Sequence, residues 1–273
     1  MVEILVHFVA PALVGVLIGV ASGLLGIGGG TVMVPIFRLA FGMSATMSTA
    51  TSLFAIIPTS ISGAISHAKG KTCIPALGIA AGLGGACMSP IGVWLAQLSP
   101  DWLVMLAAAL IIGYSAINMF KKAFKLRPAC QPVAEADASA PTADESSLSR
   151  KQLLQGAAIG LVAGLASGYV GVGGGFIMVP LMLSIIGIPM RKASGTSLIA
   201  VMILAIPGVI EQGIIGNINY LAGIAIVIGT IPGAVIGARL VTKVPERTLR
   251  LLFGCFLIVA AVMLVLNEVG IFG

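Results

Sequence analysis

The sequence has few charged residues, and this limits the class of protein that it can form. Of its 273 residues, 9% are charged and 58% are hydrophobic, and the mean hydropathy is +1.13. A soluble globular domain carries about a quarter charged residues, so this chain has too little polar surface to fold in water. The apolar content also excludes intrinsic disorder over most of the length. We therefore predict an all-α polytopic membrane protein.

Paired cysteines and a basic leader are also missing. Cys73, Cys87, Cys130 and Cys255 include no C-x-x-C pair, so we predict neither a zinc site nor a disulfide framework, and no cofactor. No Lys or Arg precedes the first apolar run, which we interpret as a retained helix and not as a signal peptide. The net charge of +6 is typical of basic cytoplasmic loops, so nucleic acid is not an expected partner.

Apolar runs long enough to cross a bilayer recur along the chain. A hydrocarbon core about 30 Å thick needs roughly 20 helical residues. Predicted single spans cover 48–66, 74–97, 102–120, 194–212, 220–241 and 249–267. Two longer runs, 4–42 and 152–190, are each interrupted by glycines. The segment 123–151, rich in Ala, Pro, Ser and acidic residues, is predicted to be a flexible linker.

The two halves of the chain resemble each other. Residues 26–35 read GIGGGTVMVP, and residues 171–180 read GVGGGFIMVP, at an offset of 145. The same offset relates Ser22 to Ser167 and persists without a net gap, which indicates duplication. We predict a first transmembrane repeat at 1–122, the linker at 123–151 and a second transmembrane repeat at 152–273.

The positions of Lys and Arg favour inverted repeats. If each interrupted run crosses once, the repeats are parallel and the basic residues divide almost evenly between the two sides. If each run makes an even number of passes, all basic residues except Arg38 lie on the linker side. Because basic loops stay in the cytoplasm, we predict inverted topology, a cytoplasmic linker and periplasmic termini. The 39 residues of 152–190 reach only about 58 Å as helix, so the second leg is expected to be short or tilted.

Consecutive glycines are predicted to break the two long runs. Each glycine costs a helix about 0.5–1 kcal/mol relative to Ala, and broken backbone in a membrane must be buried or line a wet cavity. New helices are expected from about Thr31 and Phe176, with unpaired N–H groups and positive dipole ends that attract anions. In inverted repeats these ends meet near the midplane, as in many secondary transporters. A purely structural turn is the alternative. The glycines at i, i+4 spacing, such as Gly15, Gly19 and Gly23, are assigned to helix packing.

Hydroxyl groups follow each glycine cluster. Ser and Thr at 48–52 and 194–197 are expected to open the next helices, either as caps or as donors to an oxyanion. Carboxylates are rare in the spans, Glu211 being the one candidate, and His67 is expected at the membrane interface. No catalytic residue is predicted. The predicted substrate-binding residues are Gly28, Gly29, Gly30, Thr31, Thr51, Ser52, Gly173, Gly174, Gly175, Phe176, Thr196 and Ser197.

The motif SGLLGIGGGTVMVP at 22–35, repeated at 167–180 and followed there by GTSL, resembles the TauE/SafE sulfite exporter family. The resemblance covers roughly 10–120 and 155–267. It implies a transporter, not an enzyme, that moves sulfite, thiosulfate, sulfoacetate or related organosulfur anions across a bacterial inner membrane. Together with the predicted helix ends, it favours secondary transport by alternating access, in the direction of export. An anion channel is the main alternative, and a membrane sulfur-transfer or redox protein is a weaker one.

Overall fold

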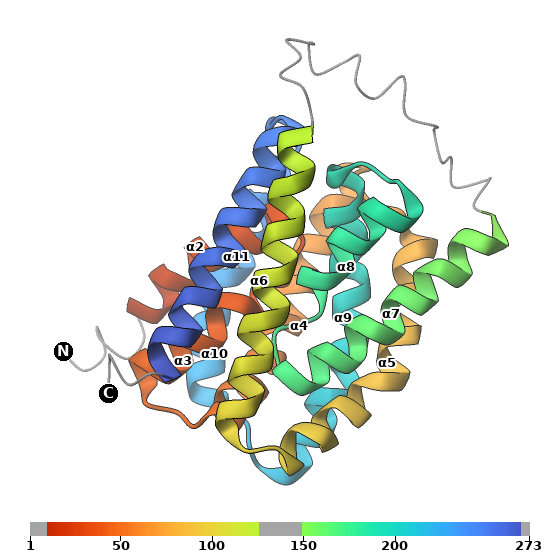
Figure 1. Cartoon of the computed structure of the whole chain (residues 1–273). Coiled ribbons are helices and arrows are strands. Elements are labelled where there is room, and N and C mark those ends of the chain that lie inside the picture. Colours follow the sequence, from red (N-terminus) through yellow and green to blue (C-terminus); the bar gives the residue numbers. More distant parts are fainter. Residues whose placement is uncertain (1–9, 126–148, 269–273) are drawn as a thin grey trace.

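A computed structural model describes residues 10–125 and 149–268, which are helical apart from short connections and contain no strand (Figure 1). The long helices are α4 (Ala45–Lys69), α5 (Pro75–Leu98), α6 (Asp101–Lys125), α7 (Arg150–Val170), α9 (Met190–Ile215), α10 (Tyr220–Leu240) and α11 (Glu246–Glu268). These seven helices of the described chain are long and apolar enough to cross a membrane. The prediction of an all-α, multi-pass membrane protein is confirmed.

Each of the six predicted single spans corresponds to one long helix, and local signals set where several helices begin. The Ser44 hydroxyl accepts a hydrogen bond from the backbone N–H of Met47 at the start of α4, at 3.2 Å. Ser149 and Gln152 form a reciprocal capping box at the start of α7. Most of the predicted linker lies at 126–148, outside the described residues.

The two longer apolar runs each contain a short second helix. In the first half, α2 (Ala10–Leu25) is followed by α3 (Gly30–Phe41). In the second half, α7 is followed by α8 (Gly175–Leu181), which continues as the π-helix η3 (Met182–Ile186). The connections at 26–29 and 171–174 hold the consecutive glycines.

Helices of one half pack mainly on helices of the other half. α2 lies along α10, and α7 lies along α5. A Cβ added to Gly19 would overlap the carbonyl oxygen of Thr230, and one added to Gly164 would overlap that of Gly85. The offset of 145 relates these two contacts to each other, because Gly19 corresponds to Gly164 and Gly85 to Thr230. The predicted packing role of the spaced glycines is therefore confirmed.

A side chain at one of these crossings is expected to prevent folding. Gly164→Leu would place carbon atoms inside the backbone of α5, and rigid backbone cannot relax as a side chain can. We expect this variant to give no monodisperse peak in size-exclusion chromatography. Gly113→Leu is the matched control, since a Cβ on Gly113 meets nothing within 4 Å, and it should elute like the unaltered protein. Normal elution of Gly164→Leu would contradict the close α5–α7 packing.

Helices α6 and α11, which occupy corresponding positions in the two halves, lie side by side and run in opposite directions (Figure 1). A Cβ on Gly254, early in α11, would lie 2.8 Å from the ring of Phe120, late in α6. At the other end, Leu106 of α6 and Val265 of α11 line one surface cavity. The start of each helix therefore meets the end of the other.

Helices α4 and α9 form a second antiparallel pair of corresponding helices. A Cβ on Gly63, late in α4, would lie 2.8 Å from Leu198 Cδ1, early in α9. A Cβ on Gly208, late in α9, would lie 3.5 Å from Leu53 Cδ1, early in α4. These two contacts are also related by the offset of 145. The pair brings both glycine connections to the same region of the core.

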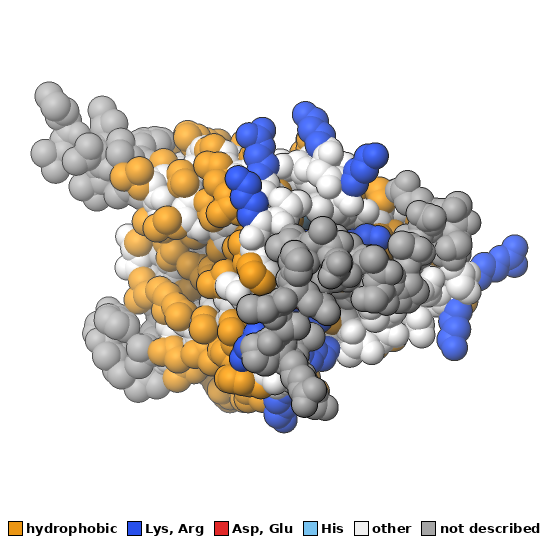
Figure 2. All heavy atoms as spheres, turned by 90° about the horizontal axis from the view of Figure 1, so that it is seen from above, with side chains coloured by type: hydrophobic (Ala, Val, Ile, Leu, Met, Phe, Trp, Pro, Cys, Tyr) orange, Lys and Arg blue, Asp and Glu red, His pale blue; other side chains and the backbone are white. Residues whose placement is uncertain are grey.

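Charge gathers at the end of the molecule that is uppermost in Figure 1, where α6 ends. Figure 2 looks down on this end and shows Lys and Arg side chains spread over it, beside a hydrophobic flank. Large apolar side chains are exposed on several helices, for example Ile214 at 83% and Leu17 at 73%. Exposed apolar surface of this extent suits a protein surrounded by lipid.

Candidate functional site

The two glycine connections have the same unusual backbone conformation. The φ angles are 74°, 81° and 83° at Gly26, Gly28 and Gly29, and 72°, 88° and 65° at Gly171, Gly173 and Gly174. Residues with a Cβ adopt this left-handed region at a cost of roughly 1–2 kcal/mol, which explains the glycines. We call residues 26–30 and 171–175 the glycine bends.

The two glycine bends contact each other directly. A Cβ on Gly30, the first residue of α3, would lie 2.5 Å from the carbonyl oxygen of Val172. A Cβ on Gly175, the first residue of α8, would lie 2.5 Å from the carbonyl oxygen of Gly26. Each short helix therefore begins against the bend of the other half. The structure thus brings the predicted residues of the two clusters into one buried region.

Both short helices begin without a side-chain cap. Their N-cap residues are Gly29 and Gly174, which have no side-chain acceptor to offer. The backbone N–H groups of Met33 and Met178 bond to the carbonyl oxygens of these glycines, at 3.2 and 3.0 Å. A helix start exposes N–H groups and the positive end of its dipole. Two such starts meeting in the core give a region that favours an anion.

Serine hydroxyls lie beside the bends. A Cβ on Gly29 would be 3.5 Å from Ser22 Cβ, and one on Gly174 would be 3.4 Å from Ser167 Cβ. Both serines are completely buried, and neither hydroxyl has a hydrogen-bond partner within the described structure. The hydroxyl of Ser60, 3.4 Å from a Cβ on Gly28, is buried and unpartnered too. A buried polar group without a partner costs about 1–3 kcal/mol, so these hydroxyls mark a place where a ligand would be stabilised.

Ser22 and Ser167 are not among the substrate-binding residues predicted from the sequence. Their repetition could have pointed to them as site residues, since Ser22 and Ser167 occupy the same position in the two copies of the motif. Ser22 and Ser167 lie in the last turns of α2 and α7, directly before the bends, which places them beside Gly29 and Gly174.

Apolar side chains fill the space between the bends. Cβ atoms on Gly28, Gly30 and Gly173 would lie 3.3, 2.5 and 2.8 Å from the side chain of Ile56. Ile56 is fully buried, and Val201, its counterpart in α9, also contacts Gly28. The region is closed in this conformation, and passage of a solute requires these side chains to move.

The hydroxyls of Thr51 and Thr196 each bond to the backbone at the start of another helix. The Thr51 hydroxyl accepts a hydrogen bond from the backbone N–H of Asn219 at 3.0 Å, just before α10. The Thr196 hydroxyl accepts one from Ile74 at 2.9 Å, just before α5. They do not cap their own helices, which begin earlier, at Ala45 and Met190. The alternative that the hydroxyls cap their own helices is therefore wrong, and a role in binding substrate stays a prediction.

The remaining predicted residues are buried in the same region. The Ser197 hydroxyl donates to the carbonyl oxygen of Gly26 at 2.7 Å, which ties α9 to the first bend. The hydroxyls of Ser52 and Thr31 are buried and have no partner within the described structure. Phe176 is fully buried at the start of α8.

His67 is buried within the protein in the last turn of α4, and its expected position at the membrane interface stays a prediction. Its Nε2 is 2.7 Å from the carbonyl oxygen of Gly23, and its Nδ1 is 2.7 Å from the hydroxyl of Thr72. A carbonyl oxygen only accepts, so Nε2 donates this bond. The imidazole therefore ties the end of α4 to the last turn of α2, directly before the first bend.

Loss of this imidazole is expected to destabilise the protein. His67→Ala removes the partner of a buried carbonyl, which costs about 1–3 kcal/mol of unfolding free energy. We expect a lower midpoint of thermal unfolding in detergent. Lys69→Ala is the matched control, because Lys69 is exposed and lies two residues after His67 in the same helical turn. It should leave the midpoint of thermal unfolding unchanged. Equal midpoints for the two variants would contradict the role assigned to His67.

The fold defines a class: a multi-pass helical membrane protein in whose core the two glycine bends lie in contact. Among the described residues, no three His, Cys, Asp or Glu side chains are grouped to hold a metal ion. Residues 11–264 match the family described as "Sulfite exporter TauE/SafE". The chain therefore belongs to the TauE/SafE family of membrane transporters, and the resemblance seen in the sequence is confirmed.

Curated relatives are similar over nearly the whole chain. "Probable membrane transporter protein YunE" of Bacillus subtilis is 27% identical, over 97% of this chain and 99% of its own length. "Probable membrane transporter protein YdhB" of the same organism is 28% identical, over 87% and 92%. A "Probable membrane transporter protein" of Haemophilus influenzae is 29% identical, over 93% and 97%. No solved structure matches the chain significantly.

Proposed function

We propose that this transporter exports small sulfur-containing anions, such as sulfite, thiosulfate or sulfoacetate, and binds them between the glycine bends. The observation that carries the proposal is the meeting of two uncapped helix starts beside the unpartnered hydroxyls of Ser22 and Ser167. The substrate class follows from the family, which is described by sulfite export. In this proposal, the bound anion is surrounded by the residues predicted from the sequence: Gly28–Thr31, Thr51–Ser52, Gly173–Phe176 and Thr196–Ser197.

Uncharged hydrogen-bond donors suit a transport site, because the site must release its ligand. The side chains nearest to the bends are aliphatic or carry hydroxyls: Ile56, Val201, Leu204, Ser22, Ser60 and Ser167 are examples. Backbone N–H groups and hydroxyls stabilise an oxyanion without a formal positive charge. An anion held in this way is bound less tightly than one held by Arg or Lys, and so can leave on the other side.

We further propose that the halves 1–122 and 152–273 are inverted repeats whose bends meet near the membrane midplane. The antiparallel pairs α6–α11 and α4–α9 support this, because they join corresponding helices of the two halves. Transport would then proceed by alternating access, with the two repeats rocking around the shared site. The basic end of the molecule (Figure 2) favours placing the linker 123–151 in the cytoplasm and the termini in the periplasm of an inner membrane.

The membrane potential supplies a driving force for export. Moving one charge across the membrane is worth about 2.3 kcal/mol per 100 mV. A cell interior that is negative therefore expels an anion without a coupled proton. This agrees with the scarcity of carboxylates in the described spans.

Counterflow in proteoliposomes tests the proposal. Vesicles are loaded with unlabelled sulfite, thiosulfate or sulfoacetate and diluted into a trace of the same labelled anion. A carrier that alternates between faces gives transient accumulation of label above equilibrium, which is the result we expect with at least one anion. Rapid equilibration without accumulation would instead indicate a channel. No flux of any of the three anions through folded protein would contradict the substrate class.

A further inference from the structure

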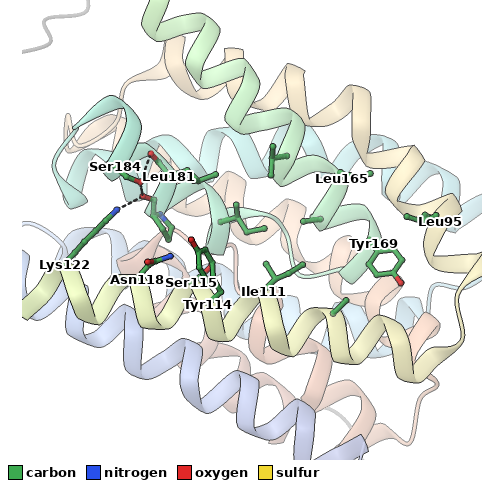
Figure 3. Close-up of a pocket in the computed structure, with 15 residues that line it drawn as sticks. Leu95, Ile111, Tyr114, Ser115, Asn118, Lys122, Leu165, Tyr169, Leu181 and Ser184 are labelled. Atoms are coloured by element: carbon green, nitrogen blue, oxygen red, sulfur yellow. Dashed lines mark hydrogen bonds between the residues drawn. The ribbon is translucent and has the colours of Figure 1, made fainter.

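Outside the bends, a cavity of about 710 Å³ lies between α6, α7 and α8 (Figure 3). Apolar side chains such as Ile111 and Leu165 line most of its length. Tyr114 is 70% exposed and Val162 57% exposed, so the cavity opens sideways between α6 and α7. Both helices are long and apolar enough to cross a membrane. The opening therefore faces lipid and not water.

Polar groups gather at one end of this groove. Ser115, Asn118 and Lys122 of α6 and Ser184 of η3 line this end, and the Lys122 side chain reaches from α6 toward Ser184 (Figure 3). Lys122 Nζ donates to the carbonyl oxygen of Pro180 at 3.0 Å, and the Ser184 hydroxyl donates to the same oxygen at 2.6 Å. The groove thus has a cationic end and an apolar length.

The charge of Lys122 has no acidic partner in the described structure. Its bonded acceptor, the Pro180 carbonyl, is neutral. Arg250 of α11 is close enough to repel Lys122, but Arg250 is itself paired with Glu246. A half-buried ammonium without a counter-ion is stabilised by a bound anion. The groove is therefore complementary in charge to an acidic headgroup.

The length of the groove suits an acyl chain. Its α6 lining runs from Ala107 to Lys122, a rise of about 22 Å at 1.5 Å per residue. Half of a hydrocarbon core is about 15 Å. The groove therefore extends from near the cytoplasmic end proposed for α6 past the midplane, deep enough for a lipid tail.

The other half of the chain provides an internal comparison. At an offset of 145, four of the polar lining residues are replaced by apolar ones: Tyr114 corresponds to Val259, Ser115 to Ala260, Asn118 to Met263 and Ser184 to Leu39, whereas Lys122 corresponds to the polar residue Asn267. The repeated fold forms without polar side chains at these four positions. Packing of the repeat therefore does not require the polar side chains that the groove carries at these positions.

We propose that this groove binds one anionic phospholipid, with its phosphate at Lys122 and Asn118 and an acyl chain between α6 and α7. A small oxyanion would use the cationic end but would leave the apolar length unfilled. Basic pockets between membrane helices on the cytoplasmic side are known to hold acidic headgroups. This site is separate from the proposed transport site and does not depend on it.

Lipid binding by the full chain in neutral detergent tests the proposal. Native mass spectrometry and thermal unfolding are recorded with phosphatidylglycerol, with phosphatidylcholine of the same chains, and with inorganic phosphate. We expect one retained phosphatidylglycerol and a higher unfolding midpoint, and neither effect from the other two. Equal effects of phosphatidylcholine would overturn the role of charge, and equal effects of inorganic phosphate would overturn the role of the acyl chain.

Substitutions locate the headgroup. Lys122→Gln should weaken phosphatidylglycerol binding about fivefold, the effect of one basic residue near an acidic lipid surface. Lys121→Gln is the matched control, because Lys121 is the exposed neighbour, and it should bind as the unaltered protein does. Asn118→Met introduces the residue that the other half carries and should also weaken binding. Unchanged binding by Lys122→Gln and Asn118→Met, or a lipid-free dimer that covers the groove, would overturn the proposal.

Discussion

Replacing Ser22 and Ser167 together with Ala is expected to reduce anion transport at least tenfold without lowering thermal stability. Both hydroxyls are buried, unpartnered and next to the glycine bends. Removing a buried hydroxyl that has no partner does not cost stability, whereas each hydrogen bond to a charged ligand is worth about 1.5–3 kcal/mol. Two lost bonds therefore exceed the 1.4 kcal/mol that corresponds to a factor of ten.

The double variant is compared with Ser62→Ala in the counterflow assay. Ser62 is partly exposed on α4, and its hydroxyl donates to the carbonyl oxygen of Ile231, away from the bends. We expect Ser62→Ala to transport the labelled anion at the rate of the unaltered protein. Full transport by the double variant would show that the serines do not bind the anion. A large drop in its unfolding midpoint would assign them a structural role instead.

Gly174→Ala is expected to leave less than a tenth of the transport activity. Gly174 has a φ of 65°, and a Cβ there would lie 3.0 Å from the carbonyl oxygen of Ala163 and beside Ser167. The methyl group would shift the start of α8, whose N–H groups belong to the proposed site. A small displacement of binding groups has a large effect on rate because the groups must be aligned with the ligand.

Gly187→Ala separates this effect from ordinary backbone strain. Gly187 has a φ of 79°, but a Cβ there meets nothing within 4 Å. Both variants carry the left-handed penalty of roughly 1–2 kcal/mol, so a difference between them reports the crowding at the bend. We expect Gly187→Ala to keep more than half of the transport rate, measured on equal amounts of folded protein. Similar losses in the two variants would mean that strain alone is responsible.

Much of the fold follows from local sequence signals. Long apolar runs predict the spans because a membrane helix must bury its backbone polar groups in its own hydrogen bonds. The duplicated motif at 22–35 and 167–180 marks the position of both bends, since consecutive glycines act locally on the backbone. The spaced glycines at Gly15, Gly19 and Gly23 predict packing, because small residues allow close helix contact.

What could not be predicted depends on contacts between distant residues. The pairing of α2 with α10 and of α7 with α5 joins segments of different halves. Helices of both halves are apolar, so apolarity alone does not determine which helix packs on which. Thr51 and Thr196 bond to Asn219 and Ile74, which are far away in the chain. No spacing in the sequence distinguishes such a hydroxyl from one that stays unpartnered, as that of Ser22 does.

The stoichiometry of anion binding tests most directly the claim that the two bends form one shared site. Equilibrium dialysis of the purified protein with labelled sulfite, thiosulfate or sulfoacetate measures the number of anions bound per chain. We expect one anion per chain, and we expect Ser22→Ala alone and Ser167→Ala alone each to weaken that single site. Two anions per chain, with each variant removing one of them and leaving the other unaffected, would contradict the claim.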